Sequence, residues 1–460
     1  MIFTDTNLLC PLKLFKNQML FSFLKYLKPT HYFTLFNKNG ELIYPLYSGL
    51  SKTDLENLEL DSGYSSELSK QYDLSYQAIE KGYIGLAQKI TTLEKIPVAD
   101  EYHFVKKYFS TFWYIYTFVI RLLTFHNPIR EVYGFLRSIR VKRYYLSNKP
   151  FEYEKWDSFE SISIKKSRKV SVIIPTLNRY EYLKDVLKDL ELQDYKNFDV
   201  IVIDQSEPFE KKFYEVFDLN IKLVYQEEKA LWLARNIAVE TSDADYLLFF
   251  DDDSRVDSDW ISSHLKCLEF FNADISSGVS ISLVGAKVPE DYAYFKHSSQ
   301  LDTGNVMIKR EVFKKIGLFD RQYEKQRMGD GEFGLRAYLY GFVNISNHIA
   351  KRLHLKVGTG GLRQMGSWDG FRPKKWFSPR PIPSVLYQFR MYYGLKMTIY
   401  LLLRTIPLSL IPYKYKGDKK IIVFSYLSLV VIWPIILIQV LISWKKATIK
   451  LNEGTLIKKI

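Results

Sequence analysis

Between Val170 and Phe250 the sequence alternates apolar runs with amphipathic stretches, and this alternation restricts the possible folds more than any other feature. The apolar runs are rich in β-branched and aromatic residues and predict buried strands: "KVSVIIP", "FDVIVID", "IKLVYQ" and "DYLLFF". The stretches between them, such as "YEYLKDVLKDLELQ" and "LWLARNIAVE", carry apolar residues at helical spacing. Repeated strand and helix units predict an α/β domain with helices on both faces of the sheet, which binds ligands at the carboxyl ends of its strands.

Three adjacent carboxylates, Asp251, Asp252 and Asp253, follow the last of these strands. Clustered carboxylates repel one another and raise each other's pKa unless a cation lies among them. Oxygen ligands on a short loop suit Mg²⁺ or Mn²⁺, and magnesium prefers one or two protein carboxylates together with substrate phosphates. The sequence therefore predicts a divalent metal site that holds a nucleotide diphosphate.

Two other interpretations explain the acidic segment less completely. A calcium loop needs oxygen ligands at alternate positions, a central glycine and a terminal glutamate, and Arg255, Val256 and Ser262 do not fit that pattern. An acidic turn that caps the next helix accounts for Asp257 or Ser258 but not for three adjacent carboxylates.

The charge of the chain favours an anionic partner. Lys and Arg exceed Asp and Glu by 14 over 460 residues. About half of this excess follows Tyr413, where nine Lys stand against Asp418 and Glu453, which indicates a membrane surface and not a nucleic acid. Two cysteines, Cys10 and Cys267, are too few for a disulfide framework or a cysteine-based metal cluster and fit a reducing compartment.

The segment from Ile421 to Trp444 has no charged residue. At about 1.5 Å per residue it is long enough, as a helix, to cross a bilayer. The alternative is a buried core helix, although core helices rarely stay free of charge for so long. The shorter apolar segment from Met397 to Pro412 is expected to form the other half of a hairpin or an in-plane helix. A hairpin in the inner or plasma membrane would keep both the α/β domain and the lysine-rich tail in the cytoplasm.

Three parts of the chain follow from these features. Residues 1–165 form an N-terminal region of unknown role, expected to be largely helical; residues 166–380 form the α/β domain; residues 381–460 form a membrane-associated region with a transmembrane helix at about 421–444. Within the first part, Tyr108 to Ile120 is uncharged but too short to span a bilayer, so a core helix or an interfacial aromatic helix is expected. The N-terminus shows no pattern of a cleaved signal peptide.

Several segments of residues 170 to 360, taken in order, resemble glycosyltransferase family 2, the inverting transferases of GT-A fold. They are "VSVIIPTLNR", "VIVIDQSE", "ARN", "FFDDDS", "DTGNVMIKREVFKKIGLFD" and "MGDGEFGLRAYLYG". The resemblance implies a Rossmann-like mixed sheet with helices on both faces. It also implies a donor site for a nucleotide sugar, formed by Pro175, Thr176, Arg179, Asp204, Arg235, Asp252, Gly304 and Asn305.

The same resemblance assigns the metal ligands and the base. Asp251 and Asp253 are expected to hold Mg²⁺ or Mn²⁺, with His354 as a third ligand or, alternatively, as a hydrogen-bonded core residue. Asp330 is the expected general base, with Glu332 as the alternative. Either acid could instead stabilise the N-terminus of its helix through the helix dipole.

Two segments depart from the family pattern. An acid usually precedes the catalytic aspartate, but here the residue is Gly329. The segment before the Arg-Asn pair is often rich in glycine, but here it reads "KALWLARN". A glycine-rich loop closing over the donor is expected at Gly358, Gly360 and Gly361, with Arg363 touching phosphate.

The leading hypothesis is a membrane-bound, metal-dependent inverting glycosyltransferase of hexosyltransferase type, which acts on a glycan or lipid-linked acceptor in cell-surface glycan or polysaccharide biosynthesis. The alternative is a catalytically inactive membrane scaffold that binds a nucleotide sugar. A nucleotidyltransferase would need a glycine-rich basic phosphate loop after the first strand, and a dinucleotide oxidoreductase would need Gly-x-Gly-x-x-Gly; neither pattern occurs.

Overall fold

The chain forms two compact units in a computed structural model, which describes residues 17–282, 288–362, 370–373, 375–411, 415 and 419–460. The helical unit comprises Met1–Phe151 with Asp369–Glu453, and the α/β unit comprises Glu152–Trp368 with Gly454–Ile460. The N-terminal region and the segment Asp369–Glu453 thus belong to one unit, whereas the last residues of the chain belong to the other. The division into three parts at 165 and 380 stays a prediction.

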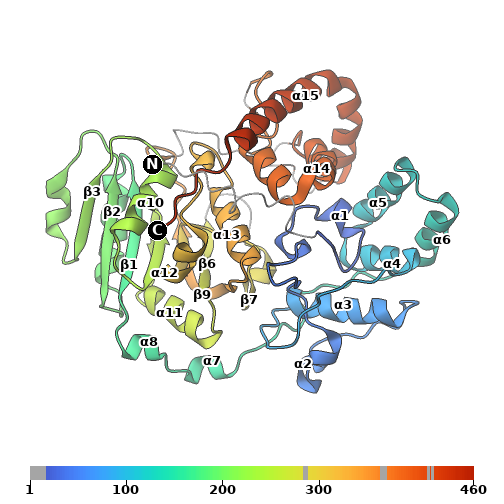
Figure 1. Ribbon diagram of the computed structural model, residues 1–460, viewed down its shortest axis with the longest axis horizontal. Coiled ribbons are helices and arrows are strands. Elements are labelled where there is room, and N and C mark those ends of the chain that lie inside the picture. The colour runs from blue at the N-terminus through green and yellow to red at the C-terminus, as the bar shows by residue number, and fades with distance from the viewer. Residues whose placement is uncertain (1–16, 283–287, 363–369, 374, 412–414, 416–418) are drawn as a thin grey trace. The chain divides into compact units, whose positions relative to one another are not determined.

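A mixed β-sheet forms the centre of the α/β unit (Figure 1). Its strands run in the order β3-β2-β1-β4-β8-β6-β9-β5, and β7 pairs with β9. The strands are β1 (Val170–Thr176), β2 (Phe198–Asp204), β3 (Ile221–Tyr225), β4 (Tyr246–Phe250), β5 (Ser254–Val256), β6 (Ile275–Ser282), β7 (Lys296–His297), β8 (Asn305–Lys309) and β9 (Asn344–His354).

The four strands that the alternating pattern predicts, β1 to β4, pair with one another in parallel. Strand β8 then enters antiparallel to β4 and β6, which makes the sheet mixed. All seven residues of β1 are buried, because helices cover the central strands on both faces. The predicted α/β class with a mixed sheet is confirmed.

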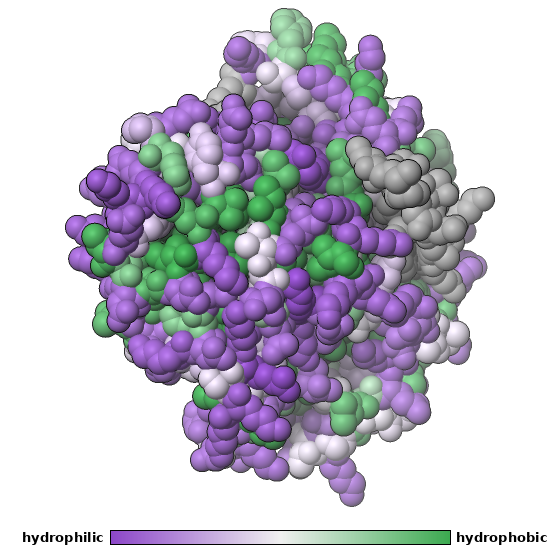
Figure 2. All heavy atoms as spheres, turned by 60° about the vertical axis from the view of Figure 1, so that its left-hand side comes forward, coloured by the Kyte–Doolittle hydropathy of each residue, from purple (hydrophilic) through white to green (hydrophobic). Residues whose placement is uncertain are grey.

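The helices of the α/β unit follow the strands in the predicted alternation. Helix α10 lies against β1 and β2, and α11 lies against β6, β8 and β9. The helices are α7 (Lys155–Ser158), α8 (Ile162–Lys165), α9 (Tyr180–Glu191), α10 (Leu231–Thr241), α11 (Trp260–Phe270), α12 (Arg310–Ile316) and α13 (Gly329–Leu339). Helix α9 buries Leu183, Leu187 and Leu190 of its predicted apolar face, together with Val186, whereas Tyr180 of that face is half-buried. The face in Figure 2 is mostly hydrophilic, with hydrophobic side chains in smaller groups, as is usual for a surface in water.

The tail Gly454–Ile460 packs on the α/β unit. The N–H of Leu318 donates to the carbonyl of Lys458 at 2.8 Å, and the N–H of Leu456 donates to Asp320 Oδ1 at 2.9 Å. The Gln322 side chain donates to the carbonyl of Gly454 at 2.9 Å. These bonds tie the residues after the last helix to the segment between α12 and α13.

The helical unit contains the predicted helices of the N-terminal region. They are α1 (Leu24–Leu27), α2 (Lys52–Glu56), α3 (Glu67–Glu80), α4 (Val98–Tyr108), α5 (Thr111–Leu123) and α6 (Pro128–Ser138). Aromatic side chains fill its core; Phe21 stacks on Phe104 with ring centroids 3.8 Å apart, and Tyr102 is fully buried. The expected helical character of this region is confirmed for the described residues.

Two long helices, α14 (Pro383–Leu408) and α15 (Lys419–Glu453), complete the helical unit and pack against each other. Helix α14 bends at Gly394, whose φ of 73° is not helical. Among the described residues, one helix, Val431–Glu453, is long and apolar enough to cross a bilayer. The apolar segment predicted at 421–444 lies within α15, and part of the shorter predicted segment lies in α14.

Candidate active site

Parallel pairing brings the carboxyl ends of β1, β2 and β4 to one edge of the sheet. Thr176, the last residue of β1, pairs with Asp204, the last residue of β2. The three adjacent aspartates follow β4 directly, and the short strand β5 then pairs antiparallel with β9 so that Ser254 lies opposite His354. The register of β5 and β9 therefore carries His354 to the aspartates, although about 100 residues separate them in the sequence.

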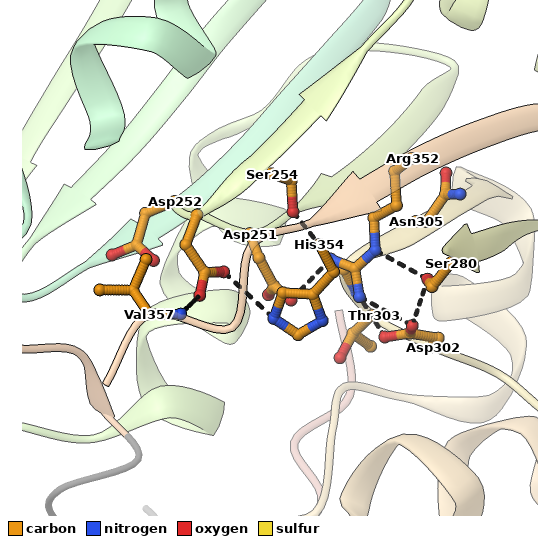
Figure 3. Close-up of polar contacts among 12 residues, drawn as sticks. Asp251, Asp252, Ser254, Ser280, Asp302, Thr303, Asn305, Arg352, His354 and Val357 are labelled. Atoms are coloured by element: carbon orange, nitrogen blue, oxygen red, sulfur yellow. Dashed lines mark hydrogen bonds and ion pairs between the residues drawn. The ribbon is translucent and has the colours of Figure 1, made fainter. Parts of the chain in front are cut away.

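Asp251, Asp253 and His354 form a cluster that could hold a metal ion. One ligand atom from each residue lies within 4.8 Å of the others. Figure 3 shows His354 beside the acidic loop. The His354 Nε2 lies 3.3 Å from Asp253 Oδ1. Carboxylate oxygens and an imidazole nitrogen suit Mn²⁺ or Mg²⁺, so the donor set fits the predicted cation.

An arginine that the sequence analysis did not identify, Arg352, lies at the centre of the site (Figure 3). It is buried on β9 and donates from Nη1 to Asp251 Oδ2 at 2.7 Å and from Nη2 to Asp302 Oδ2 at 2.8 Å. Ser280 accepts from its Nε at 2.7 Å, and Ser254 accepts from its Nη1 at 3.1 Å. Burial alone would raise the pKa of Asp251, but the charges of Arg352 and Arg235 outweigh it and hold that pKa below its usual value.

Asp302 is the second residue that the sequence analysis missed. It accepts from Arg352, from the Ser280 hydroxyl at 2.8 Å and from the Gly304 N–H at 3.0 Å. A signal for Arg352 existed, because residues two apart on a strand share a face and Arg352 precedes His354 by two. Asp302 is the first residue of the family-like segment "DTGNVMIKREVFKKIGLFD", in which the sequence assigned roles only to Gly304 and Asn305.

Asp252 connects the acidic loop to the end of β1. Its carboxylate accepts from the Thr176 hydroxyl at 2.9 Å and from Arg179 Nη1 at 2.8 Å. The same guanidinium lies 3.3 Å from Asp253 Oδ2. Burial raises the pKa of Asp252 to about 6, even though the positive charge of Arg179 opposes the shift. Pro175 is buried in β1 directly before Thr176.

Arg179 also holds the glycine-rich loop after β9. Its guanidinium donates to the carbonyls of Val357 and Thr359 at 3.1 and 3.2 Å. Gly360 and Gly361 both have positive φ, and a Cβ on Gly361 would lie 2.3 Å from Arg179 Cζ. The loop is thus in close contact with the predicted nucleotide segment, while Arg363 lies outside the described residues. Closure of the loop over the donor stays a prediction.

Arg235 approaches the site from α10. Its Nη2 donates to Asp251 Oδ1 at 3.3 Å and to the carbonyl of Thr303 at 3.2 Å. Its Nε is buried and has no hydrogen-bond partner among the described residues. Since buried N–H groups are rarely left unpaired, this donor is available for an oxygen of a bound ligand.

Gly304 permits the close approach of two charged groups. A Cβ at this position would lie 2.0 Å from Arg352 Nη1 and 2.2 Å from Asp251 Oδ2. The neighbouring Asn305 is fully buried, and its side chain bonds to the core: it donates to the carbonyls of Val279 and Ala350 and accepts from Trp260 and His264. In this arrangement Asn305 positions the end of β8, and its contact with the donor sugar stays a prediction.

Asp204 is enclosed at the end of β2. Its Oδ2 accepts from the hydroxyls of Tyr180 and Tyr214 at 2.7 and 2.8 Å, and its Oδ1 accepts from the Ser206 N–H at 2.9 Å. The side chain is fully buried. Its bonds hold the loop after β2 against α9, and the predicted contact with the donor base would require one of the two tyrosines to give way.

The two candidates for the general base differ in their surroundings. Asp330 is partly exposed at the start of α13 and accepts from the Gly331 N–H at 2.8 Å. Burial of its carboxyl group and the charge of Asp302 raise the pKa of Asp330. Glu332 is fully buried and receives two bonds from Arg336, at 2.8 and 3.0 Å. This pairing uses the Glu332 carboxylate inside α13, so the geometry favours Asp330.

The two departures from the family pattern meet in space. Gly329 lies against the indole of Trp232, and a Cβ at position 329 would be 2.4 Å from Trp232 Cζ2. Trp232 is 3% exposed, donates from Nε1 to the carbonyl of Tyr323 at 3.1 Å and has Arg235 over its ring. The tryptophan therefore fills the space that a side chain at position 329 would need, which explains the glycine before Asp330.

This contact predicts that Gly329→Ala lowers the free energy of unfolding by about 1–3 kcal/mol, because it adds a carbon to a filled space. The loss should shrink when Trp232 is changed to Leu in the same protein, since the added carbon then has room. Thermal unfolding of the four proteins of this cycle measures the coupling. Gly358→Ala is the matched control, because a Cβ there meets nothing within 4 Å. Equal effects of Gly329→Ala with and without Trp232 would contradict the explanation.

Comparison with known proteins agrees with the sequence resemblance. Residues 171–325 match the family model described as Glycosyl transferase family 2. Glycosyltransferase GlyA of Streptococcus pneumoniae serotype 4 is 27% identical over 168 residues, a match that covers 35% of this chain and 22% of that protein. The amylovoran biosynthesis glycosyltransferase AmsB of Erwinia amylovora is 30% identical over 197 residues, covering 37% of this chain and 64% of that protein. The match thus spans less than two thirds of either relative.

Solved structures show lower similarity. The crystal structure of Staphylococcus aureus TarS 1-349 in complex with UDP-GlcNAc has a TM-score of 0.39 and 18% identity, covering 55% of this chain and 74% of that chain. The mannosyltransferase PcManGT from Pyrobaculum calidifontis, in complex with GDP-Man and Mn²⁺, has a TM-score of 0.39 and 14% identity, covering 65% and 91%.

Proposed function

We propose that this chain belongs to glycosyl transferase family 2, whose model residues 171–325 match, and that it transfers a sugar from a nucleotide-diphosphate donor to an acceptor hydroxyl, with inversion at the anomeric carbon. The observation that carries the proposal is the cluster of Asp251, Asp253 and His354 at the carboxyl edge of the sheet. An α/β sheet binds its ligands at this edge, and a cluster of oxygen and imidazole ligands suits a cation that binds diphosphate.

The residues of the cluster and its surroundings would bind the nucleotide-sugar donor. The unpaired Nε of Arg235 and the guanidinium of Arg179 offer positive charge and N–H donors to an anionic donor. Asp251, Asp253 and His354 would hold Mg²⁺ or Mn²⁺, and a bound cation would stabilise the negative charge of the leaving nucleotide diphosphate. Gly304 has no side chain, which lets Arg352 lie against Asp251 of this group.

In the proposed reaction the acceptor oxygen forms a bond to the anomeric carbon while the bond from that carbon to the phosphate oxygen breaks. The nucleotide diphosphate leaves, and the acceptor proton passes to the Asp330 carboxylate. A raised pKa suits this role, because a carboxylate of very low pKa accepts protons poorly. Asp302 and Arg352 fix the orientation of Asp251 and do not exchange protons in this scheme.

The long apolar helices of the helical unit support a proposal for the acceptor and for the place where the protein acts. We propose a glycan or lipid-linked acceptor at a membrane, because α14 and α15 carry the long apolar segments of the chain. The proposed site of action is the cytoplasmic face of the inner or plasma membrane, in cell-surface glycan or polysaccharide biosynthesis. No nucleic-acid role is proposed.

A panel of nucleotide sugars tests the function. With Mn²⁺ present, the correct donor should raise the melting temperature of the purified protein, since a ligand that binds only the folded state stabilises it by about 2.7 kcal/mol at 100 times its Kd. The same donor should be transferred to an acceptor, or hydrolysed slowly without one. Metal-dependent binding with neither transfer nor hydrolysis would favour the inactive scaffold. Absence of any metal-dependent stabilisation across the panel would contradict both functions.

A further inference from the structure

The helix α6 has its polar and apolar faces reversed relative to a helix that packs on a protein core. Its buried residues are Glu131, Gly134 and Ser138, which face α4: Tyr102 donates to Glu131 at 2.7 Å, and Ser138 donates to the carbonyl of Ala99 at 3.2 Å. A Cβ on Gly134 would lie 2.8 Å from the Tyr102 ring, so the two helices are in close contact. The small and polar side of α6 is therefore the side that packs against the protein.

The outward side of α6 is apolar. Its exposed large side chains are Ile129, Val132, Tyr133 and Leu136, which lie at helical spacing. Ile139, directly after the helix, is also exposed. Ile129 is 79% exposed and Leu136 is 59% exposed. Helix α5 adds further exposed apolar residues, Val119, Leu122 and Leu123, and Phe125 follows at 97% exposure. A contiguous group of apolar side chains of this size is unusual on a surface exposed to water. Such a group marks a surface that contacts another molecule or a membrane.

Positive charge surrounds this apolar surface. Five basic residues in and after α6 are exposed: Arg130, Arg137, Arg140, Lys142 and Arg143. The single acid between Thr111 and Lys149 is Glu131, which is buried and held by Arg121 Nε at 3.0 Å. The exposed charges of this segment are therefore all positive, and they complement an anionic partner.

The apolar surface continues toward the long helices of the same unit. Helix α5 meets α15 through Phe112 and Tyr116, whose rings lie 5.6 and 6.2 Å from that of Tyr426, and Arg404 of α14 lies over Trp113. Helices α14 and α15 expose Leu403, Phe424 and Leu427. An apolar helix face bordered by arginines and lysines is the pattern of a helix that lies in the surface of a bilayer.

We propose that α5 and α6 (Thr111–Ser138) form an in-plane membrane-binding surface. Their exposed apolar residues would lie among the acyl chains, and the five basic residues in and after α6 would contact anionic lipid headgroups. This gives the N-terminal region a role separate from the donor site. This surface would hold the helical unit on the bilayer beside α14 and α15. Its binding partner would therefore be lipid, and not another protein or a second copy of the chain.

Depth-dependent quenching in the full-length protein tests this inference. A polarity-sensitive fluorophore is attached to Leu136→Cys in a Cys10→Ser background, because Cys267 is buried and does not react. In vesicles containing phosphatidylglycerol, the probe should lose most of its emission when nitroxide-labelled lipid is included. A probe at Thr53→Cys, exposed on α2 of the same unit, is the matched control and should keep its emission.

The charge of the lipid and of the helix provides the second readout. Quenching at position 136 should fall in vesicles of neutral lipid alone, or when Arg137, Arg140, Lys142 and Arg143 are all changed to Gln. Equal quenching at positions 53 and 136 would overturn the proposal. A probe at position 136 that nitroxide lipid does not quench, together with disulfide cross-linking of the unlabelled Leu136→Cys protein between copies, would assign the surface to a second copy instead. Metal-dependent nucleotide-sugar binding in the same preparation should be unaffected by these changes, which separates this test from that of the transferase activity.

Discussion

Replacing Asp330 by asparagine is expected to lower the rate of sugar transfer by at least about 10²-fold while donor binding stays close to that of the unaltered protein. An amide cannot take the proton of the acceptor hydroxyl, but it keeps the shape of the carboxylate and can still accept from the Gly331 N–H. The measurements are kcat at saturating donor and donor affinity from metal-dependent thermal shift. A fall in kcat without a matching loss of affinity identifies a group that acts in the transition state.

Glu332→Gln is the matched control for this prediction. Because Glu332 is buried against Arg336, the change should lower the melting temperature, and the protein that remains folded should still transfer sugar. The reverse pattern, with full transfer in Asp330→Asn and a loss of kcat in Glu332→Gln, would assign the base to Glu332.

The pH profile of the unaltered protein bears on the same residue. Burial and the charge of Asp302 raise the pKa of Asp330, and a base works only when it is deprotonated. The value of kcat/KM should therefore fall as the pH drops through this raised pKa, at a higher pH than an exposed aspartate would give. The residual activity of Asp330→Asn should lack this acidic limb.

The second large effect is expected from Asp253→Asn, which should abolish the stabilisation that metal and nucleotide sugar give together and lower transfer by at least about 10²-fold. Asp253 is 2% exposed and contributes one of the three clustered ligand atoms, so a neutral amide there weakens the site for a cation. A metal chelator should cause the same loss in the unaltered protein, and added Mn²⁺ should reverse it. In Asp253→Asn, added Mn²⁺ should restore little.

Asp257→Asn provides the control for charge alone, because Asp257 is an exposed acid on the same segment and is not part of the cluster. This variant should keep the metal response. Transfer and donor binding that do not change on chelation would remove the basis for a metal at Asp251, Asp253 and His354.

The sequence was sufficient to predict strands β1 to β4 and the location of the acidic loop. Strand β2 occupies Phe198–Asp204 as its apolar run predicts, and Asp251 follows β4 directly. These features are local: a strand is recognised from its own residues, and a carboxylate after a parallel strand must lie at the carboxyl edge. The order of the motifs then indicated the family that residues 171–325 match.

The electrostatic surroundings of the loop could not be predicted in the same way. Arg352 bonds to Asp251 from 101 positions away and to Asp302 from 50 positions away. These contacts depend on the register of β9 against β6 and β5, and a shift of one residue would turn Arg352 to the other face of the sheet. The pairing of Trp232 with Gly329 is similar, since each residue looks like an isolated departure until the two are seen in contact.

The hydrogen bonds of the short tail Gly454–Ile460 constrain how the chain can traverse a bilayer. The tail is held by Leu318, Asp320 and Gln322, so the chain returns after α15 to the same α/β unit that precedes α14. A chain that leaves a unit on one side of a bilayer and rejoins the same unit must come back to the side from which it left. Passages through the lipid by α14 and α15 can therefore occur only in pairs, and a lone crossing by α15 is incompatible with the docked tail.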